Sequence, residues 1–270
     1  MNHLKVLQQV YEAGEARALY RLVMETRFGL SHTDLLLGKD TQLSEEDQAE
    51  LEIIVERLLR NEPVQYILGQ AEFCGRRFLV EPGVLIPRPE TEDLVNAVVP
   101  SCPCSILDIG TGSGCIAVTL ALKGYRVTAF DISPIALRIA QKNAEVLGAK
   151  VNFRIEDILH PKPTEEHWDV IISNPPYVCE SEAVEMDENV LHYEPHLALF
   201  VPDSDPLLFY RAIAEYACQH LNPGGQLLME INRAFGKKVK NMIEMVGFEH
   251  VKTSTDRYGN ERIVEGRCSL

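Results

Sequence analysis

The sequence predicts an α/β protein in which a mostly parallel sheet, covered by helices on both faces, follows a small bundle of helices. Two observations support this prediction. Residues 1–62 show only helical repeats of apolar residues, whereas residues 105–267 alternate short apolar runs, rich in β-branched residues, with longer helical patterns. Strands that are buried on both faces are apolar throughout, and their alternation with helices is typical of parallel sheets.

The first segment, residues 1–62, is expected to form a helical bundle domain. Apolar residues repeat at helical spacing within residues 4–11, 16–24 and 51–59. Two serines, each followed three residues later by an aspartate, mark helix starts, and these pairs are Ser31 with Asp34 and Ser44 with Asp47. The sequence leaves open whether this bundle binds a partner or shields the main domain.

A linking β-hairpin is expected over residues 63–85. The pieces "VQYILG", "AEFCG" and "RRFLVEPG" resemble short strands separated by glycines. The main domain then spans residues 86–270. It opens with a helix in "LIPRPETEDLV", where Pro89 suits the first turn and Glu90, Glu92 and Asp93 complement the helix N-terminus.

The strands expected in the main domain are "SILDIG", "RVTAFDI", "KVNFRIED", "WDVIIS", "GGQLLMEI", "FEHVKTST" and "RIVEGR". In open parallel sheets, ligands bind at the carboxyl ends of the strands. The connection between "WDVIIS" and "DPLLF" is too long for a simple turn, which indicates a functional or mobile segment.

A glycine-rich turn follows the first of these strands, in "LDIGTGSGCIAV". Gly110, Gly112 and Gly114 permit a tight turn and let a ligand approach the backbone closely. Asp131 ends the next strand, where a carboxylate can accept hydrogen bonds from both hydroxyls of a ribose. Two ligands fit so far, a nicotinamide dinucleotide and S-adenosylmethionine, although Cys115 stands where the dinucleotide fingerprint has Gly or Ala. Asp157 and Ile158, after the third strand, lie where a polar contact and an apolar cover for adenine are expected.

The stretch "SNPPYV" follows the apolar run "WDVIIS". Proline has no N–H to give to a strand, so the chain must leave the sheet at Asn174. The combination of the glycine-rich turn, Asp131 and "NPPY" resembles the class I S-adenosylmethionine-dependent methyltransferases. Within that class, "NPPY" is similar to the motif of enzymes that methylate a planar NH₂ group, either the amino group of adenine or a glutamine amide. Asn174 Oδ1 and the Pro175 carbonyl would each accept one N–H of that group. Pro176 would keep the turn rigid, and Tyr177 would stack on the planar group unless it only packs in the core.

Further motifs match one family over essentially the whole chain. "LIPRPETE", "NPPYV", "EPHLALF", "GGQLLMEI" and "ERIV" together resemble the release factor glutamine methyltransferases, the HemK or PrmC family. The resemblance implies a Rossmann-like, seven-stranded methyltransferase domain after a helical domain. It also implies N5-methylation of the glutamine in the Gly-Gly-Gln loop of class 1 peptide chain release factors, a step of translation termination, with S-adenosylhomocysteine as the second product.

The resemblance assigns residues to the two substrates. The donor site falls on Gly110, Thr111, Gly112, Ser113, Gly114, Asp131, Asp157, Ile158 and Asn174. The glutamine site falls on Asn174, Pro175, Pro176 and Tyr177, with Arg88 and Glu90 of the "PRPE" segment beside it; Arg88 can instead be a structural ion-pair partner. The expected catalytic residues are Asn174, Pro175 and Tyr177.

The chain departs from the family pattern in three places, which affect the adenine contacts and the lid more than the reaction. "VPDSDPL" replaces a glycine-rich turn, and "EINRAFG" replaces the usual "EIG-x-x-Q-G". Ile158 or Leu159 stands where many members have a Trp after the third strand. Two other functions are weighed against the main one. The first is an adenine-N6 methyltransferase acting on nucleic acid, and the second is a non-catalytic dinucleotide-binding protein, which would leave the position of "NPPY" unexplained.

Charge opposes a nucleic-acid substrate. The formal net charge is −14, and residues 178–206 contain eight acids and no Lys or Arg, so a phosphate backbone would be repelled. No apolar run approaches the roughly 20 residues of a membrane span. The N-terminus also lacks the apolar core of a signal peptide, so we expect a cytoplasmic protein that does not bind membranes. We also expect a monomer.

The seven cysteines are scattered along the chain, which favours reduced thiols over disulfides. Cys102 and Cys104 form the only close pair. Without a second pair or a nearby histidine they do not make a zinc site, so no metal is expected.

Overall fold

The computed structural model describes residues 3–98, 104–256 and 259–269, and the chain forms two compact units. The smaller unit contains the chain up to Gln70 together with Asp187–Tyr193. The larger unit contains Ala71–Met186 and the chain from Glu194 onward. The hairpin expected over residues 63–85 is therefore divided, because residues 63–70 group with the helices.

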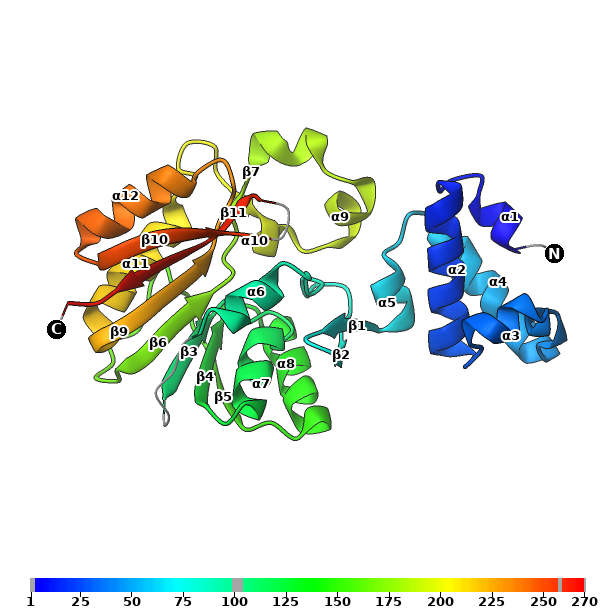
Figure 1. Ribbon diagram of the computed structural model, residues 1–270, viewed down its shortest axis with the longest axis horizontal. Helices are drawn as coiled ribbons and strands as arrows, with labels where there is room; N and C mark the ends of the chain where they lie inside the picture. The colour runs from blue at the N-terminus through cyan, green and yellow to red at the C-terminus, as the bar shows by residue number, and fades with distance from the viewer. Residues whose placement is uncertain (1–2, 99–103, 257–258, 270) are drawn as a thin grey trace. The chain divides into compact units, whose positions relative to one another are not determined.

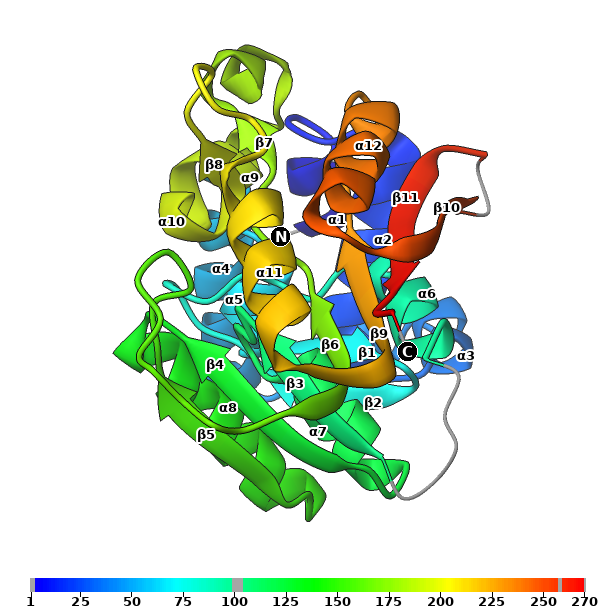
Figure 2. The same cartoon turned by 90° about the vertical axis from the view of Figure 1, so that its left-hand side faces the viewer.

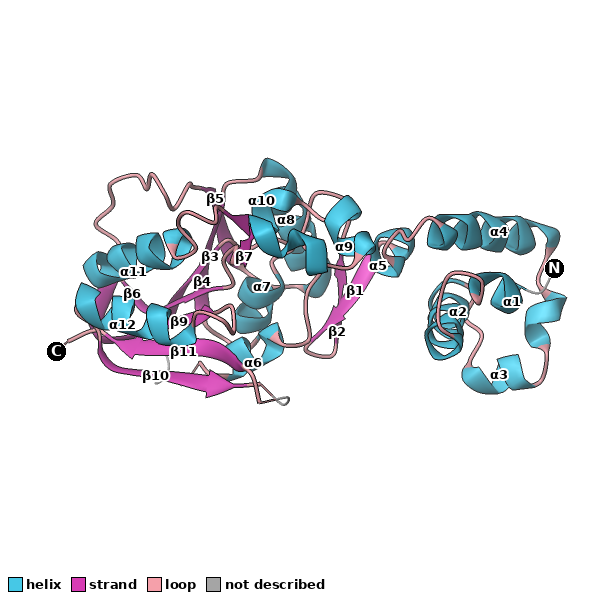
Figure 3. Cartoon of the chain, turned by 90° about the horizontal axis from the view of Figure 1, so that it is seen from above, coloured by secondary structure: helices cyan, strands magenta, loops and turns pink. Residues whose placement is uncertain are grey.

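The smaller unit is helical, as predicted (Figure 3). Its helices are α1 (His3–Leu7), α2 (Ala13–Arg27), α3 (His32–Leu36), the 3-10 helix η1 (Lys39–Gln42), α4 (Glu45–Leu59), α5 (Val64–Leu68) and α9 (Glu188–Tyr193). Ser31 and Ser44 cap α3 and α4 as predicted, each accepting a hydrogen bond from the backbone N–H three residues later. Leu7, Met24, Leu51 and Leu58 are buried at its centre.

The prediction that "VQYILG" is a strand is wrong, because these residues form α5. Pro63 precedes the helix, and its carbonyl accepts hydrogen bonds from Tyr66 and Ile67. Gly69 ends it in the left-handed conformation, with φ of 71°. A short apolar run fits a strand or a buried helical turn equally well, and here Val64 packs into the helical core.

The hairpin itself is confirmed in shorter form. Strands β1 (Gln70–Phe73) and β2 (Arg76–Leu79) are joined by Cys74 and Gly75, which both have positive φ, at 49° and 68°. Positive φ at both central residues is the geometry that matches the twist of a two-residue hairpin.

The larger unit contains a seven-stranded sheet in the order β10-β11-β9-β6-β3-β4-β5. The strands are β3 (Ser105–Ile109), β4 (Arg126–Asp131), β5 (Val151–Ile155), β6 (Trp168–Ser173), β9 (Leu221–Glu230), β10 (Glu249–Thr255) and β11 (Glu261–Arg267). All neighbouring pairs from β5 to β9 are parallel, whereas β11 pairs antiparallel with both β9 and β10. The predicted mostly parallel sheet is thus confirmed.

Helices cover both faces of this sheet (Figures 1 and 2). Helices α6 (Thr91–Asn96), α7 (Cys115–Leu122) and α8 (Pro134–Leu147) pack on one face, and α11 (Leu208–His220) and α12 (Gly236–Val246) pack on the other. Successive residues of β3 serve the two cores in turn, Ile106 on the first face and Leu107 on the second. Helix α6 begins at Thr91, so Pro89 lies in the turn before it and not in its first turn as predicted.

The strand register aligns the ends of four strands. One row across the sheet consists of Phe130, Ile109, Ser173 and Met229. The residues that follow this row, on β4, β3, β6 and β9, are Asp131, Gly110, Asn174 and Glu230. Because these strands are parallel, all four residues lie at the same edge of the sheet, where ligands of such folds bind.

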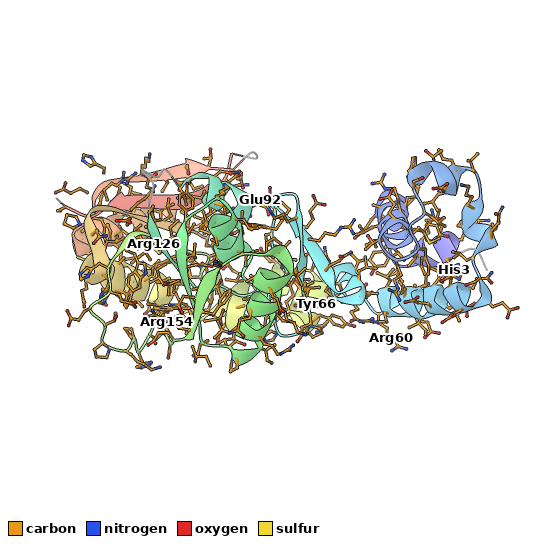
Figure 4. All side chains as sticks on the ribbon, turned by 90° about the horizontal axis from the view of Figure 1, so that it is seen from below. His3, Arg60, Tyr66, Glu92, Arg126 and Arg154 are labelled. Carbon is orange, nitrogen blue, oxygen red and sulfur yellow. The ribbon has the colours of Figure 1, made fainter. Side chains whose placement is uncertain are left out.

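The long acidic connection, residues 178–206, has structure of its own. It contains β7 (Val178–Cys179), the 3-10 helix η2 (Glu180–Glu185), α9, α10 (His196–Leu199) and β8 (Phe200–Val201), with β7 and β8 paired in parallel. Within the smaller unit, the Tyr193 hydroxyl at the end of α9 donates to the carbonyl of Arg60, a residue labelled in Figure 4, at 2.8 Å. Asn61 Nδ2 donates to Glu188 Oε2 at 3.0 Å. No helix in the described part of the chain is long and apolar enough to span a membrane.

Candidate functional site

A cavity of about 400 Å³ lies in the larger unit, at the carboxyl ends of the parallel strands. It is lined by the turn between β3 and α7, the ends of β4 and β6, the residues after β5, and the segment before α6. The lining includes most of the residues predicted for the two substrates: Gly110, Thr111, Gly112, Ser113, Asp131, Asp157, Ile158, Asn174, Pro175, Pro176 and Arg88. Gly114, Tyr177 and Glu90 do not line it.

The glycine-rich turn presents open backbone to this cavity. Gly110 and Gly112 have positive φ, at 73° and 56°, and a Cβ built on either would meet no atom within 4 Å. Gly114 differs, because a Cβ there would lie 2.9 Å from Ala140 Cβ on α8. The first two glycines therefore leave space for a ligand, whereas Gly114 permits close packing of α7 against α8.

Asp131 lines the cavity and supports the glycine turn. Its Oδ2 accepts a hydrogen bond from Gly112 N and its Oδ1 accepts one from Ser133 N, both at 2.8 Å. A carboxylate has about four acceptor positions, so each oxygen can take one more donor. Burial raises the pKa of Asp131, and the two backbone hydrogen bonds act in the opposite direction.

Asp108, one strand away, is completely buried. Its Oδ2 accepts from Thr111 Oγ1 at 2.6 Å, which ties the glycine turn to β3. Oδ1 has no hydrogen-bond partner among the described residues. Burial raises the pKa of Asp108 to about 7.

Asp157 and Ile158 line the cavity after β5, as the sequence predicts. Asp157 Oδ1 accepts from Leu159 N at 2.9 Å, and Oδ2 lies 3.0 Å from His160 Nδ1. The hydrogen bond with His160 lowers the pKa of Asp157. Ile158 packs against the core beneath α11 and leaves an apolar surface toward the cavity.

Asn174 and Pro175 directly follow β6 and line the cavity. Asn174 Nδ2 donates to Thr91 Oγ1 at 3.1 Å. Within the described residues, neither Asn174 Oδ1 nor the Pro175 carbonyl accepts a hydrogen bond. Both oxygens thus keep acceptor positions open, and their hydrogen bonds with a substrate NH₂ group stay a prediction.

Tyr177 is held by Glu230 and does not reach the cavity lining. Its hydroxyl donates to Glu230 Oε1 at 3.1 Å, and its ring packs against the core that includes α11. Thr91 Oγ1 donates to the other oxygen, Glu230 Oε2, at 2.7 Å. Burial raises the pKa of both Glu230 and Tyr177. This geometry favours the packing alternative for Tyr177, and its stacking on a substrate stays a prediction.

Arg88 forms the ion pair that the sequence allowed as an alternative. Its guanidinium lies 2.5 Å from Glu194 Oε1, and the Glu194 side chain is only 1% exposed. Glu194 Oε2 also accepts from Ile86 N at 3.1 Å. Arg88 also lines the cavity, and its contact with the substrate stays a prediction. Glu90 is the N-cap residue of α6 and lies outside the lining.

Sequence reasoning missed three functional candidates, namely Thr91, Glu230 and Glu194. Each stands inside a motif quoted above: "LIPRPETE", "GGQLLMEI" or "EPHLALF". The motifs signalled the segments, but the hydrogen bonds join residues more than 100 positions apart in the chain.

No group of three or more His, Cys, Asp or Glu in the described residues could hold a metal ion. The six described cysteines are free thiols. Cys102, whose pairing with Cys104 was weighed as a zinc site, lies outside the described residues.

Comparison with known proteins places the chain in a family. Residues 5–69 match a family model described as the PrmC N-terminal domain, and residues 90–193 match the methyltransferase small domain. The release factor glutamine methyltransferase of Bacteroides thetaiotaomicron is 51% identical over 96% of this chain and 95% of its own length. The chain belongs to the release factor glutamine methyltransferase family. The relative from Flavobacterium psychrophilum is 40% identical over 97% of this chain and 95% of its own length.

Solved structures agree on the fold. A methyltransferase from Pyrococcus furiosus has a TM-score of 0.56 at 20% identity, covering 80% of this chain and 98% of its own. The Thermus thermophilus 16S rRNA N2 G1207 methyltransferase, solved with AdoMet and guanosine, has a TM-score of 0.54 at 19% identity. The match covers 74% of this chain and 49% of its own. At these identities the likeness shows a shared methyltransferase fold, which confirms the Rossmann-like class I architecture expected from the family.

Proposed function

We propose that this protein transfers a methyl group from S-adenosylmethionine to the N5 side-chain amide of the glutamine in the Gly-Gly-Gln motif of class 1 peptide chain release factors. One observation carries the proposal. In a chain of this family, Asn174 and Pro175 line the same cavity as the glycine turn and Asp131, and neither Asn174 Oδ1 nor the Pro175 carbonyl accepts a hydrogen bond within the described residues.

The residues of the cavity fit the methyl donor. Gly110 and Gly112 leave open space beside the backbone, and Asp131 keeps acceptor positions for two ribose hydroxyls. Ile158 supplies an apolar surface of the kind that covers an adenine ring. The volume of about 400 Å³ lies within the range of small-molecule sites. When bound, S-adenosylmethionine supplies an electrophilic methyl group on a sulfonium, and S-adenosylhomocysteine is the other product.

The protein's contribution follows from the chemistry of an amide nitrogen. Its lone pair is delocalised, and losing that conjugation costs about 18–20 kcal/mol, the barrier to rotation about the C–N bond. If Asn174 Oδ1 and the Pro175 carbonyl each accept one N–H, they orient the nitrogen and stabilise the positive charge that develops on it. Holding two reactants in line can lower a barrier by about 7–11 kcal/mol. No base is needed before transfer, because the nitrogen loses its proton readily once it is alkylated.

The partner and the cellular setting are part of the proposal. A release factor is the protein substrate, and the setting is the cytoplasm, where translation terminates. The net charge of −14 and the eight acids of residues 178–206 support a protein substrate over a nucleic acid. A monomer suffices, because the larger unit alone provides every residue that lines the cavity.

The proposal is tested with methyl-labelled S-adenosylmethionine and three acceptors. These are a purified class 1 release factor, the same factor with the glutamine of its Gly-Gly-Gln motif changed to Ala, and unmethylated DNA. We expect label on the unaltered factor alone. Label on DNA would replace the proposal with adenine-N6 methylation, and no label on any acceptor, with donor bound, would leave a binding protein without this activity.

A further inference from the structure

A chain of hydrogen bonds connects Asn174 with Thr91, which also lines the cavity, and with Glu230, which does not. Asn174 Nδ2 lies 3.1 Å from Thr91 Oγ1, which lies 2.7 Å from Glu230 Oε2. Thr91 is 2% exposed and Glu230 is 1% exposed, so water does not compete for these contacts. The three residues come from β9, the start of α6 and the end of β6, and they meet because β6 and β9 are neighbouring parallel strands.

The number of available hydrogens decides which atom donates in each of these hydrogen bonds. A carboxylate only accepts, and a threonine hydroxyl has a single hydrogen. The Thr91 hydrogen therefore goes to Glu230, and Thr91 Oγ1 can only accept from Asn174. The group of Asn174 that faces Thr91 must then be its NH₂, which turns Oδ1 away from Thr91.

We propose that Thr91 and Glu230 are positioning residues that hold the Asn174 amide in one of its two orientations, with Nδ2 toward Thr91 and Oδ1 available to the substrate amide. The inference rests on the proposed function, because orientation matters only if a substrate NH₂ must meet an acceptor. In the opposite orientation, the Asn174 NH₂ would face the substrate NH₂, and two donors cannot form a hydrogen bond.

Tyr177 completes the arrangement from the other side of Glu230. Its hydroxyl donates to Glu230 Oε1 at 3.1 Å, so each carboxylate oxygen receives one hydroxyl hydrogen. Because the Thr91 and Tyr177 hydroxyls each donate to one oxygen, they favour the ionised carboxylate, which can only accept from Thr91. Tyr177 thus acts on Asn174 through Glu230 and Thr91 while its ring packs in the core.

The first test removes the hydroxyl and keeps the shape. Thr91→Val leaves nothing for Asn174 Nδ2 to donate to, so the amide is free to turn over. Thr91→Ser restores the hydroxyl. Thr119→Val is the matched control, because Thr119 is a buried helical threonine outside the cavity whose hydroxyl has no partner among the described residues.

Steady-state kinetics with the release factor should separate an effect on the orientation of the Asn174 amide from an effect on folding. Loss of a transition-state hydrogen bond lowers kcat by about 10²–10³, and loss of its orientation should cost less, about tenfold to a hundredfold for Thr91→Val. KM for the release factor and the Kd and stoichiometry of S-adenosylhomocysteine should change less than about twofold. Thr91→Ser and Thr119→Val should retain the wild-type kcat.

The second test removes the carboxylate. Glu230→Gln offers one acceptor oxygen to two hydroxyls, Thr91 and Tyr177, so the direction of the chain is no longer enforced. We expect kcat to fall again. In the Thr91→Val background, however, Glu230→Gln should lower kcat no further, because the link from Glu230 to Asn174 is already missing. If the two substitutions lowered kcat by the product of their separate factors, they would act as two independent structural losses, and the inference would be overturned.

The outcomes distinguish this inference from the proposed function. Wild-type protein that does not methylate the release factor contradicts the proposed function itself. Wild-type protein that does, together with a Thr91→Val variant that keeps full kcat, contradicts only the positioning role. A fall in kcat with a matching fall in the stoichiometry of S-adenosylhomocysteine binding would show misfolding and also contradict it.

Discussion

Asp131→Ala tests the donor site most directly, because Asp131 serves both the protein and the ligand. Its two oxygens each hold one backbone N–H at 2.8 Å, from Gly112 and Ser133, and each keeps a position for a ribose hydroxyl. The substitution removes all four acceptor roles at once. Two observables should therefore respond, donor affinity and stability.

The magnitudes follow from the type of hydrogen bond. Hydrogen bonds to a charged group contribute about 1.5–3 kcal/mol each. Part of the binding free energy lost with Asp131 is recovered, because water can solvate the freed hydroxyls of the ribose. We expect donor binding to weaken by about 1–3 kcal/mol, which is about 5-fold to 150-fold in Kd. Gly112 and Ser133 line the cavity, so water can reach their orphaned N–H groups and the unfolding free energy should fall by only about 1–2 kcal/mol.

Calorimetric titration with S-adenosylhomocysteine measures the first effect, and urea unfolding measures the second. Asp203→Ala is the matched control, since Asp203 also accepts from a backbone N–H, that of Ser181 at 3.1 Å, but lies outside the cavity. An Asp131→Ala protein that binds one S-adenosylhomocysteine with wild-type affinity would refute the assignment of the ribose to Asp131.

The remaining predictions concern one catalytic and two structural residues. Asn174→Ala should lower kcat by about 10²–10³ and leave donor Kd nearly unchanged, because it removes an acceptor needed mainly in the transition state; equal losses in kinetics and in donor titration would contradict that role. Asp108→Asn should raise stability increasingly from pH 5 to pH 8. The pKa of Asp108 is raised from 3.8 to about 7 on folding, so the stability that its neutral form contributes is present below pH 3.8 and lost as the pH rises to 7. At about 1.4 kcal/mol per pKa unit the gain at pH 8 reaches at most about 4 kcal/mol, and unfolding curves with the same gain at both pH values would disprove it. Gly114→Ala should cost about 2–4 kcal/mol of unfolding free energy, from its φ of 80° and from the Cβ 2.9 Å from that of Ala140. Gly148→Ala, with φ of 73° and no atom within 4 Å, isolates the backbone part, and urea unfolding should show it to be the milder change.

Local patterns were enough for most of the fold. The central strands β3, β6 and β9 contain runs of apolar residues that can be recognised alone. The serine caps at Ser31 and Ser44 depend on residues three positions away. The strand prediction for "VQYILG" failed because four apolar residues in so short a run carry no decisive period. Its helical state depends on burial of Val64 against α2 and α4, which no local pattern encodes.

The candidate site divides in the same way. The glycine turn, Asp131 and Asn174 were predictable because each directly follows a strand, and parallel strands bring their carboxyl ends to one edge. For Tyr177 the sequence left stacking and core packing open, and only the structure shows that its hydroxyl contacts Glu230, 53 positions away. A motif states which residues are adjacent in the chain but not which side chains turn toward the ligand.

The sequence by itself determined the two-part organisation, the order of the strands of the main sheet, the family and the residues at the strand ends. These properties depend on short-range periodicity, on proline and glycine geometry, and on motifs read along the chain. Only the tertiary structure decided the partners of those residues: Thr91 and Glu230 in a hydrogen-bond chain with Asn174, Glu194 beside Arg88, and α9 grouped with the helical unit. Such contacts depend on strand register and helix packing, which place residues 83 to 139 positions apart within hydrogen-bond distance.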